Sequence, residues 1–264
     1  MPFGLLVFAM RMCQYKYMKR LIDIMLSSVG IIIGFPVIVV FSLLIIGLHR
    51  HNPFFVTERI GRNSRMFPLF KLKSMVDGAH FDAITVVTKR DPRVTAVGRI
   101  IRRYKIDEFP QFFNVMIGDM SVVGPRPEIP QNGNLFNEAE REMFSVKPGL
   151  TGISSIFFFR QSDVLSRFSN PQEAYHRIIR PSKAHFSLFY VFRHNLTMDV
   201  ELIVLTFVAI FNHALAIRIL RARLIAWGAP EQLLDVFDRA LAPSVAEDIK
   251  VPGDEYLAAL TRCG

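Results

Sequence analysis

The apolar stretch "LIDIMLSSVGIIIGFPVIVVFSLLIIGL", Leu21 to Leu48, contains a single charged residue, Asp23. Its length predicts a helix that can cross a bilayer, which takes about 20 apolar residues. Pro36 lies near its middle, where a proline removes a backbone donor and favours a kink or a break. Each arm of roughly a dozen residues would rise only about 18 Å, short of the ~30 Å hydrocarbon core. We therefore predict a re-entrant helix over residues 16-50 that bends at Pro36, while an ordinary kinked span stays open.

Basic residues flank this apolar stretch on both sides. They are Arg11, Lys16, Lys19 and Arg20 before it, and Arg50, Arg59, Arg62 and Arg65 after it. Segments rich in Lys and Arg tend to stay cytoplasmic, so both ends of the helix are expected on the cytoplasmic side of a membrane. Residues 1-10 are apolar and precede the first basic residue, the reverse of the order in a secretory signal. Residues 1-15 are therefore interpreted as an N-terminal extension.

The chain as a whole is both basic and apolar. Its 264 residues include 32 Lys and Arg against 23 Asp and Glu, for a net charge of +9, and 51% are hydrophobic. This combination favours a membrane surface or a phospholipid-like substrate over nucleic acid as a partner. Cys13 and Cys263 lie near opposite ends, which argues against a disulfide framework and fits a reducing compartment. The length favours one main domain with appendages.

The segment after the apolar stretch, residues 52-75, predicts a β-hairpin. It reads "NPFFVTERIGRNSRMFPLFKLKSM", in which two β-favouring runs are separated by Gly-Arg-Asn-Ser. Lys71 and Lys73 would share one face of the second strand, because side chains two residues apart point the same way. Residues 91-120 are predicted to be helical in parts.

The C-terminal third predicts further helices. Residues 202-217 are short for a membrane span and follow two acids, Asp199 and Glu201, so they are interpreted as an interfacial or core helix. Composition changes at Arg218, so residues 218-264 predict an amphipathic helical tail, which leaves residues 51-217 as the main domain. The predicted fold is α+β and mostly helical: a membrane-associated monotopic domain with the re-entrant helix, the short hairpin and interfacial amphipathic helices.

The stretch "RRYKIDEFP", residues 102-110, places two acids side by side, Asp107 and Glu108. Each raises the cost of ionising the other unless a metal or fixed cations compensate. A planar guanidinium group can bind two phosphate oxygens, and helical spacing puts at least two of the preceding arginines on one side. Those arginines are Arg99, Arg102 and Arg103. The acid pair together with these arginines thus indicates phosphate chemistry. A simpler interpretation stays open for each: the acids could lie at a helix start, and the arginines could form a basic face that rests on lipid headgroups.

Five stretches follow one another as in the bacterial sugar transferases, the monotopic polyprenyl-phosphate phosphoglycosyl transferases. They are "KRLIDIMLSSVGIIIGFP", "ERIGRNSRMFPLFKLKSM", "DPRVTAVGRIIRRYKIDEFPQFFNVMIGDMSVVGPRP", "VKPGLTG" and "RPSKAHFSLFYVFRHNLTMDVELI". Together they cover roughly residues 16-210, which a chance motif match does not do. The chain resembles the small catalytic-core members. That resemblance implies transfer of a phospho-sugar from a UDP-sugar to a polyprenyl (undecaprenyl) phosphate, with Mg²⁺, to begin assembly of a surface glycan. It also implies that the protein lies on the cytoplasmic face of the bacterial inner membrane.

The resemblance also implies roles for individual residues. Asp107 would be the nucleophile and Glu108 its metal-binding neighbour, the pair lying at the Mg²⁺ site. Lys71, Arg102 and Arg126 would contact phosphate. A carboxylate nucleophile forms an acyl phosphate and so splits one displacement into two. Two alternatives stay open: direct transfer with Asp107 as a general base, and a catalytically silent membrane-surface adaptor. A homo-oligomer is also possible.

Three departures from the family pattern limit what the resemblance implies. Lys73 stands in "KLKSM" where arginine is usual, which weakens the case for a bidentate phosphate contact there. Phe109 replaces a leucine, a tolerable apolar change. "TGISSIFFF", residues 151-159, departs from the common pattern in a region associated with sugar choice or packing. The identity of the sugar is therefore not readable from the sequence.

Overall fold

The computed structural model describes residues 3-78, 86-88, 91-241 and 249-262, so Cys263 lies outside it. The strands are β1 (Phe54–Ile60), β2 (Met66–Leu72), β3 (Ser121–Val123) and β4 (Gly149–Thr151). The helices are α1 (Phe3–His49), α2 (Ala96–Arg103), α3 (Gln111–Ile117), α4 (Glu138–Arg141), α5 (Ile153–Phe157), α6 (Gln161–Leu165), α7 (Pro171–Ala174), α8 (Arg180–Arg193), α9 (Leu196–Phe211), α10 (His213–Ala226), α11 (Glu231–Leu241) and α12 (Asp254–Arg262). Short 3-10 or π turns are η1 (Arg62–Ser64), η2 (Ile106–Glu108), η3 (Pro130–Leu135), η4 (Glu142–Ser145) and η5 (Tyr175–Ile179). The predicted mostly helical α+β class is confirmed.

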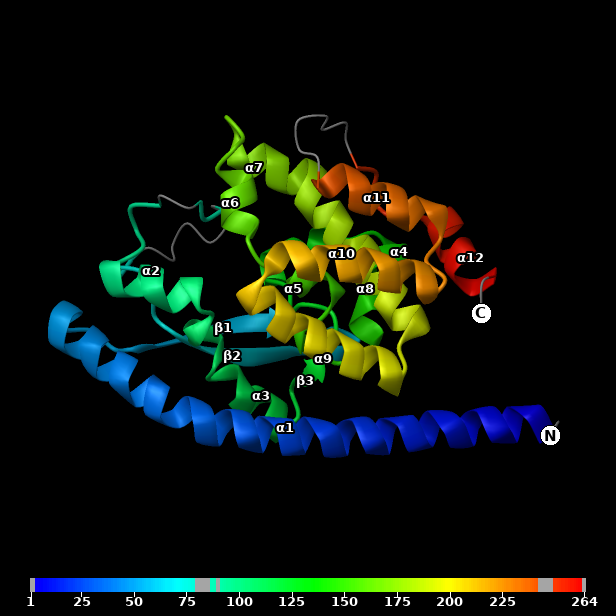
Figure 1. Cartoon of the computed structure of the whole chain (residues 1–264), viewed down its shortest axis with the longest axis horizontal. Coiled ribbons are helices and arrows are strands. Elements are labelled where there is room, and N and C mark those ends of the chain that lie inside the picture. Colours follow the sequence, from blue (N-terminus) through cyan, green and yellow to red (C-terminus); the bar gives the residue numbers. More distant parts are fainter. Residues whose placement is uncertain (1–2, 79–85, 89–90, 242–248, 263–264) are drawn as a thin grey trace.

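Helix α1 is the longest element and lies along one side of the other helices (Figure 1). It continues through Pro36 as a helix and bends over its C-terminal part in that view. Within the described residues it is the one helix long and apolar enough to cross a membrane. Many of its apolar side chains are exposed, including Ile32 and Leu43. The predicted boundary between residues 15 and 16 falls inside this helix.

Small residues on α1 receive aromatic side chains from the segment that carries the acid pair. A Cβ atom on Gly30 would lie 2.6 Å from the ring of Phe112, and one on Gly34 would lie 3.4 Å from the ring of Phe109. Further along α1, Ile38 and Ile45 are buried in a cluster with Leu72, Val97, Ile101 and Ile106. The apolar helix therefore lies directly beneath η2 and α2.

Two charged side chains of α1 also hold the domain in place. Asp23 is buried and accepts hydrogen bonds from Ser121 Oγ at 3.0 Å and Val122 N at 2.8 Å, at the start of β3. Arg20 donates to two carbonyl oxygens at the end of α3, each at 2.7 Å. The single acid of the apolar stretch is thus a partner of the domain and does not face lipid.

The predicted hairpin is confirmed. β1 and β2 pair antiparallel from Phe54 opposite Leu72 to Ile60 opposite Met66. The buried amide of Asn114 in α3 fixes β2, because its Nδ2 donates to Pro68 O at 2.6 Å and its Oδ1 accepts from Phe70 N at 3.1 Å. The helix that follows the acid pair therefore holds the strand that carries Lys71.

Close backbone contact joins the second sheet, in which β3 and β4 run parallel. A Cβ atom on Gly149 would lie 2.1 Å from the backbone nitrogen of Gly124, and one on Gly124 would lie 2.6 Å from Lys147 O. Only glycine fits at such contacts. Because Pro125 and Arg126 follow Gly124 directly, this contact sets the path of the loop that carries Arg126.

The C-terminal helices pack on the domain and share its core. Phe237 of α11 lies 4.7 Å, centroid to centroid, from Phe157 of α5, which also contacts Phe186 of α8. In α9, Leu205 is buried while Phe211 is 87% exposed, which fits the predicted interfacial or core helix. The predicted boundary between residues 217 and 218 falls inside α10, so the expected tail begins within a packed helix.

Candidate active site

The acid pair lies on a tight turn between α2 and α3. Helix α2 ends at Arg103, and Lys105 then adopts a left-handed backbone conformation with φ 57°. This conformation is uncommon for a residue other than glycine, asparagine or aspartate. It reverses the chain so that Asp107 and Glu108 lie on η2, while the buried side chain of Ile106 packs toward α1.

The two acids have different surroundings although they are adjacent. Glu108 Oε1 accepts a hydrogen bond from Arg126 Nη2 at 2.6 Å and lies 3.9 Å from Lys105 Nζ. Asp107 Oδ1 is buried and has no hydrogen-bond partner among the described residues. Glu108 is therefore paired with a guanidinium group, whereas Asp107 has one oxygen without a hydrogen-bond partner among the described residues.

These surroundings separate the two pKa values. Burial alone would raise the pKa of Glu108, but Arg126, Lys105 and Lys71 outweigh it and hold that pKa well below its usual range. Burial, followed by the neighbouring charge of Glu108, raises the pKa of Asp107. Burial also lowers the pKa of Lys71 to about 8. Two acids whose environments push their pKa values apart are a common sign of divided roles at a site.

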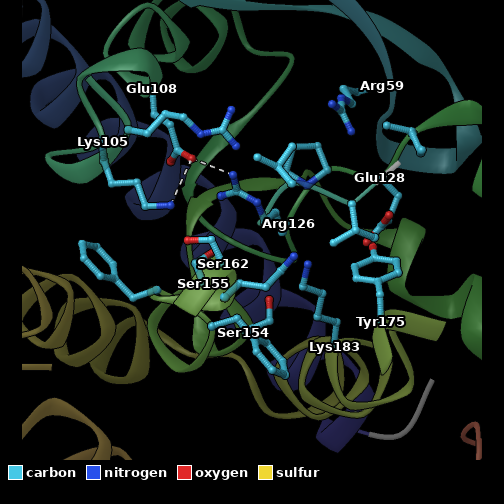
Figure 2. Close-up of a pocket in the computed structure, with 18 of the residues that line it drawn as sticks. Arg59, Lys105, Glu108, Arg126, Glu128, Ser154, Ser155, Ser162, Tyr175 and Lys183 are labelled. Atoms are coloured by element: carbon cyan, nitrogen blue, oxygen red, sulfur yellow. Dashed lines mark hydrogen bonds and ion pairs between the residues drawn. The ribbon is translucent and has the colours of Figure 1, made fainter. Parts of the chain in front are cut away.

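The pair opens into a cavity of about 340 Å³, within the range of small-molecule sites (Figure 2). Its charged lining is Arg59, Lys71, Arg102, Lys105, Arg126 and Lys183, with Asp107, Glu108 and Glu128. Further lining residues include Asn132, Ser154, Ser155, Phe158, Phe159, Ser162, Tyr175 and His176. Cations outnumber carboxylates in this lining, which suits an anionic ligand.

The residues expected to bind phosphate differ in where they lie. Lys71, Arg102 and Arg126 all line the cavity. Lys73 lies just after the end of β2 and pairs with Asp77 at 2.7 Å, so the expected shared face with Lys71 does not place both lysines in the cavity. The other predicted arginines turn elsewhere: Arg99 donates to Val94 O, and Arg103 lies over the ring of Tyr104.

Sequence reasoning missed several lining residues, among them Arg59, Lys105, Tyr175 and Lys183. Arg59 was interpreted only as a flanking charge. Lys105 lies two residues before Asp107, and this position is the one local signal that could have identified it. Tyr175 and Lys183 come from η5 and α8 and reach the cavity through the tertiary fold.

The acid pair is chemically suited to Mg²⁺. Among the described residues there is no group of three or more His, Cys, Asp or Glu side chains that could hold a metal. Mg²⁺ does not require one, because it binds through one or two carboxylates plus substrate phosphates and retains water. Asp107, with its unpartnered buried oxygen, and the adjacent Glu108 supply such a pair.

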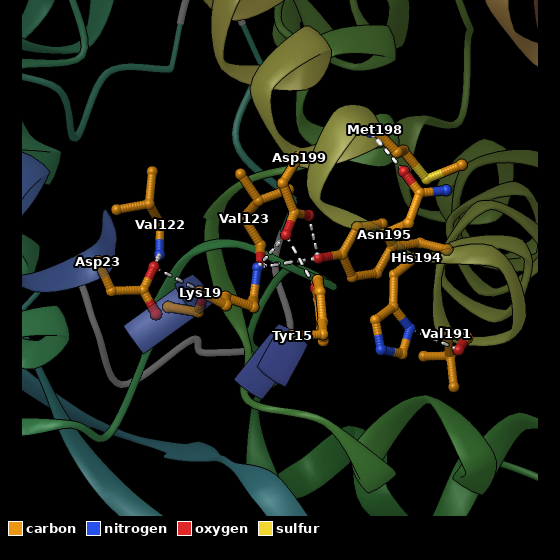
Figure 3. A network of polar contacts seen from close by, with 12 residues as sticks. Tyr15, Lys19, Asp23, Val122, Val123, Val191, His194, Asn195, Met198 and Asp199 are labelled. Carbon is orange, nitrogen blue, oxygen red and sulfur yellow. Dashed lines mark hydrogen bonds and ion pairs between the residues drawn. The ribbon is translucent and has the colours of Figure 1, made fainter. Parts of the chain in front are cut away.

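A second buried polar cluster joins α1 to α8 and α9 (Figure 3). Asp199 accepts hydrogen bonds from Tyr190 Oη at 2.6 Å on one oxygen, and from Tyr15 Oη and Lys19 Nζ at 2.8 Å on the other. Its side chain is 5% exposed. Because both of its oxygens have partners, this cluster has the character of a structural joint.

Comparison with known proteins shows the family to which the chain is related. Residues 14–213 match the family model described as bacterial sugar transferase. A Bacillus subtilis (strain 168) protein provisionally named an undecaprenyl-phosphate N-acetylgalactosaminyl 1-phosphate transferase is 47% identical over 44% of this chain and 65% of its own length. The undecaprenyl-phosphate glucose phosphotransferase of Komagataeibacter xylinus is 38% identical over 59% of this chain and 31% of its own. The UDP-glucose:undecaprenyl-phosphate glucose-1-phosphate transferase of Xanthomonas campestris pv. campestris is 31% identical over 75% of this chain and 40% of its own.

The chain spans less than two thirds of the length of each of these relatives. The family match is broader from the side of this chain: it extends from α1 to the first residue of α10 and includes the acid pair, both sheets and the Arg126 loop. The chain belongs to the bacterial sugar transferase family.

Proposed function

We propose that this protein transfers a phospho-sugar from a UDP-sugar to undecaprenyl phosphate and thereby begins assembly of a surface polysaccharide. The observation that carries the proposal is the buried, unpartnered oxygen of Asp107 in a cavity lined by lysines and arginines, directly above the apolar helix α1. The names of the relatives, which refer to undecaprenyl-phosphate sugar transfer, support the same reaction.

The reaction would proceed in two displacements. A carboxylate oxygen of Asp107 attacks the phosphorus that bears the sugar, a new P–O bond forms, and the diphosphate P–O bond breaks with its electron pair leaving on UMP. A phosphate oxygen of undecaprenyl phosphate then attacks the same phosphorus. The bond to Asp107 breaks, the carboxylate is restored, and the product is an undecaprenyl diphosphate sugar. A covalent intermediate of this kind divides one difficult step into two.

The surrounding residues would bind and orient the reacting groups. Arg126, Lys71 and Arg102 line the cavity around the acid pair and would hold the diphosphate oxygens as charge builds on them. Glu108 stays ionised because Arg126 and the neighbouring lysines hold its pKa low despite burial. Glu108 and Asp107 would hold Mg²⁺, which when bound neutralises phosphate charge and acts as a Lewis acid.

We also propose that the chain lies on the cytoplasmic face of the inner membrane with α1 re-entrant. The donor is soluble, whereas the acceptor phosphate lies at headgroup level on a lipid whose tail stays in the bilayer. The exposed apolar side chains of α1 and the bend seen beyond its middle support an entry without crossing (Figure 1). Crossing would also export Lys16, Lys19 and Arg20.

Labelling of introduced cysteines tests this path. In a chain with Cys13 and Cys263 changed to serine, cysteines near positions 10 and 60 should both react only after the inner membrane is permeabilised. Pro36→Leu should straighten α1 and move a fraction of chains to a spanning form. Labelling of position 10 from the periplasm in the otherwise unchanged chain would contradict the re-entrant path and leave the chemistry at Asp107 unaffected.

The reaction itself is tested with the purified full-length protein in lipid vesicles containing polyprenyl phosphate, with Mg²⁺ and a panel of UDP-sugars. We expect UMP release that requires the lipid. Parallel lines in double-reciprocal plots would support the covalent route, and intersecting lines would support direct transfer with Asp107 as general base. No UMP release with any donor would support the adaptor alternative instead.

A further inference from the structure

The cavity has two ends that meet at Arg126. At one end Glu108 accepts from Arg126 and is approached by Lys105. At the other end lie Glu128, Tyr175 and Lys183, and Figure 2 shows this group across Arg126 from Lys105 and Glu108. Among the charged neighbours of Lys183, Glu128 has the largest effect on its pKa, whereas Glu108 has the largest effect on that of Asp107.

Two adjacent aromatic residues between α5 and α6 face the two ends separately. Lys105 Nζ lies 5.4 Å from the ring centroid of Phe159, and Lys183 Nζ lies 5.8 Å from that of Phe158. One short segment of chain thus borders both halves of the cavity. It is the segment in which the sequence departs from the family's common pattern.

Two serine side chains, Ser155 and Ser162, line the cavity at the end near Lys105 and Glu108 (Figure 2). Ser155 Oγ is buried and has no hydrogen-bond partner in the part of the chain that the structure describes. Figure 2 places Ser155 and Ser162 on the same side of the cavity as Lys105. A hydroxyl group can both donate and accept, so it can bind a sugar hydroxyl in either sense. A buried hydroxyl group without a protein partner in the cavity lining is suited to a ligand rich in hydroxyl groups.

The geometry of phosphoryl transfer assigns the ends. The attacking and leaving oxygens lie roughly in line with the phosphorus, so UMP must leave on the side away from Asp107. That direction leads past Arg126 toward Glu128 and Tyr175, where a carboxylate can accept from ribose hydroxyls and a phenol ring can stack on a base. The sugar, which stays on the phosphorus that Asp107 attacks, remains at the serine end.

We propose that Ser155 and Ser162, with Phe159, form the subsite that selects the transferred sugar, while Glu128, Tyr175 and Lys183 hold the nucleotide. This inference rests on the proposed function and extends it. Relatives in the family are named for N-acetylgalactosamine, glucose and galactose, so membership alone does not decide the sugar. Glucose and galactose differ in the orientation of one hydroxyl group, which a fixed hydroxyl partner can distinguish.

The experiment compares donor choice with nucleotide affinity in the same variants. Full-length protein in vesicles with polyprenyl phosphate and Mg²⁺ is assayed with UDP-glucose, UDP-galactose and their N-acetylated counterparts, and UMP is used as an inhibitor. Ser155→Ala should lower kcat/KM for the preferred donor about tenfold and reduce its preference over the epimer. The inhibition constant of UMP for the Ser155→Ala variant should differ less than about twofold from that for the wild type.

Lys183→Met should show the opposite pattern. Loss of the cation at the nucleotide end should raise the inhibition constant for UMP about tenfold and leave the ranking of donors unchanged. Ser166→Ala is the matched control, because its exposed hydroxyl donates to Asp163 O and does not line the cavity. It should change neither quantity. Because Ser155 Oγ has no protein partner, its removal is not expected to unfold the chain.

Two results would overturn the assignment while leaving the proposed function intact. One is turnover in which Ser155→Ala and Ser162→Ala keep the wild-type donor preference. The other is a reversed pattern, in which Ser155→Ala weakens UMP and Lys183→Met changes donor choice. Absence of UMP release by the wild type with every donor would instead reject the function, and the sugar subsite with it.

Discussion

Two buried acids in this molecule, Asp107 and Asp199, are held in opposite ways. Asp199 joins α1 to α8 and α9, and both of its oxygens accept hydrogen bonds, from Tyr190 on one and from Tyr15 and Lys19 on the other (Figure 3). Asp107 keeps a buried oxygen without a partner among the described residues. Buried polar groups in proteins are normally paired, so a carboxylate left unpaired in a cavity indicates a ligand site. An acid whose two oxygens both accept hydrogen bonds from the protein therefore has a structural role. An acid that keeps an unpaired oxygen in a cavity is a candidate for the reaction.

The charges around the two acids also differ: the positive charge is matched at Asp199 and in excess around Asp107. At the joint, one ammonium group, Lys19, faces Asp199 at 2.8 Å. In the cavity, cations outnumber acids, and burial lowers the pKa of both Lys71 and Lys183 to about 8. Lysines with pKa values this low do not have enough negative charge around them in the protein to offset the cost of burying their ammonium groups. An anionic ligand would supply the missing negative charge.

Asp107→Asn should give the largest effect. It keeps the shape of the side chain and removes the nucleophile, so turnover should fall by at least about a thousandfold, measured as UMP release. Because burial raises the pKa of Asp107, removing its charge should leave the unfolding temperature unchanged or higher. Asp119→Asn makes the same charge change outside the cavity lining and should retain activity. Substantial turnover by Asp107→Asn would exclude the covalent route.

Arg126→Lys should give the next largest effect. Lysine keeps the charge but loses the planar fork that can hold Glu108 and two phosphate oxygens together. We expect kcat/KM to fall about ten- to a hundredfold, since hydrogen bonds to charged groups contribute about 1.5–3 kcal/mol each. Arg62→Lys, on the hairpin turn outside the cavity lining, is the control. Equal activity in both variants would reduce Arg126 to a general source of charge.

The sequence predicted the half of the cavity that is continuous along the chain. Asp107, Glu108 and Arg102 lie within seven residues, and their charges conflict unless they meet a phosphate or a metal, which made them conspicuous. Arg126 and Lys71 were inferred only from the family resemblance. The contacts that place these residues at the cavity, such as that of Gly124 with Gly149, join segments that are distant in the sequence. Nothing in either segment alone predicts its contact with the other.

The other half of the cavity could not be predicted from local patterns. Lys183 belongs to α8, most of whose residues are buried, and Tyr175 begins η5, in which Ile178 and Ile179 are buried. In sequence both residues therefore resemble positions in or beside the core. The role of Asp23 could not be predicted either, because its partner is distant in the sequence. It was the sole charge in an apolar stretch, and its partner at the start of β3 is about a hundred residues away.

Asp199→Asn should weaken the joint and affect chemistry only through it. The amide nitrogen would face either the hydroxyl of Tyr190 or the donors of Tyr15 and Lys19, depending on its orientation. In both cases a donor meets a donor, which leaves a buried group unpaired at a cost of about 1–3 kcal/mol. We expect a lower unfolding temperature in lipid vesicles and near-normal turnover per folded molecule at low temperature. Asp238→Asn breaks an exposed pair with Arg221 and should change the unfolding temperature much less. Stability equal to wild type in Asp199→Asn would contradict its role as a joint.

The smallest effect expected is a change of UMP affinity with pH. Burial lowers the pKa of Lys183 and of Lys71 to about 8, so both are mostly charged at pH 7 and mostly neutral at pH 9.5. The phosphate of UMP is mostly doubly ionised across this range, because its second pKa is about 6. Affinity should therefore fall several-fold as pH rises through 8, measured by titration calorimetry at constant Mg²⁺. Of the groups near Lys183, Arg59 has its pKa lowered by burial only to about 10, and the pKa of Tyr175 is raised, so neither titrates in the lower part of this window.

Lys183→Met separates the two lysines in this titration. The variant should bind UMP more weakly at pH 7 and show a shallower fall, since Lys71 alone remains to lose its proton. Lys183→Arg should keep the affinity at pH 9.5, because a guanidinium group stays charged there. A wild-type affinity that is constant from pH 7 to 9.5 would show that these lysines do not meet the nucleotide phosphate. The cavity would then differ from the Asp199 joint in its unpaired acid and not in its cations.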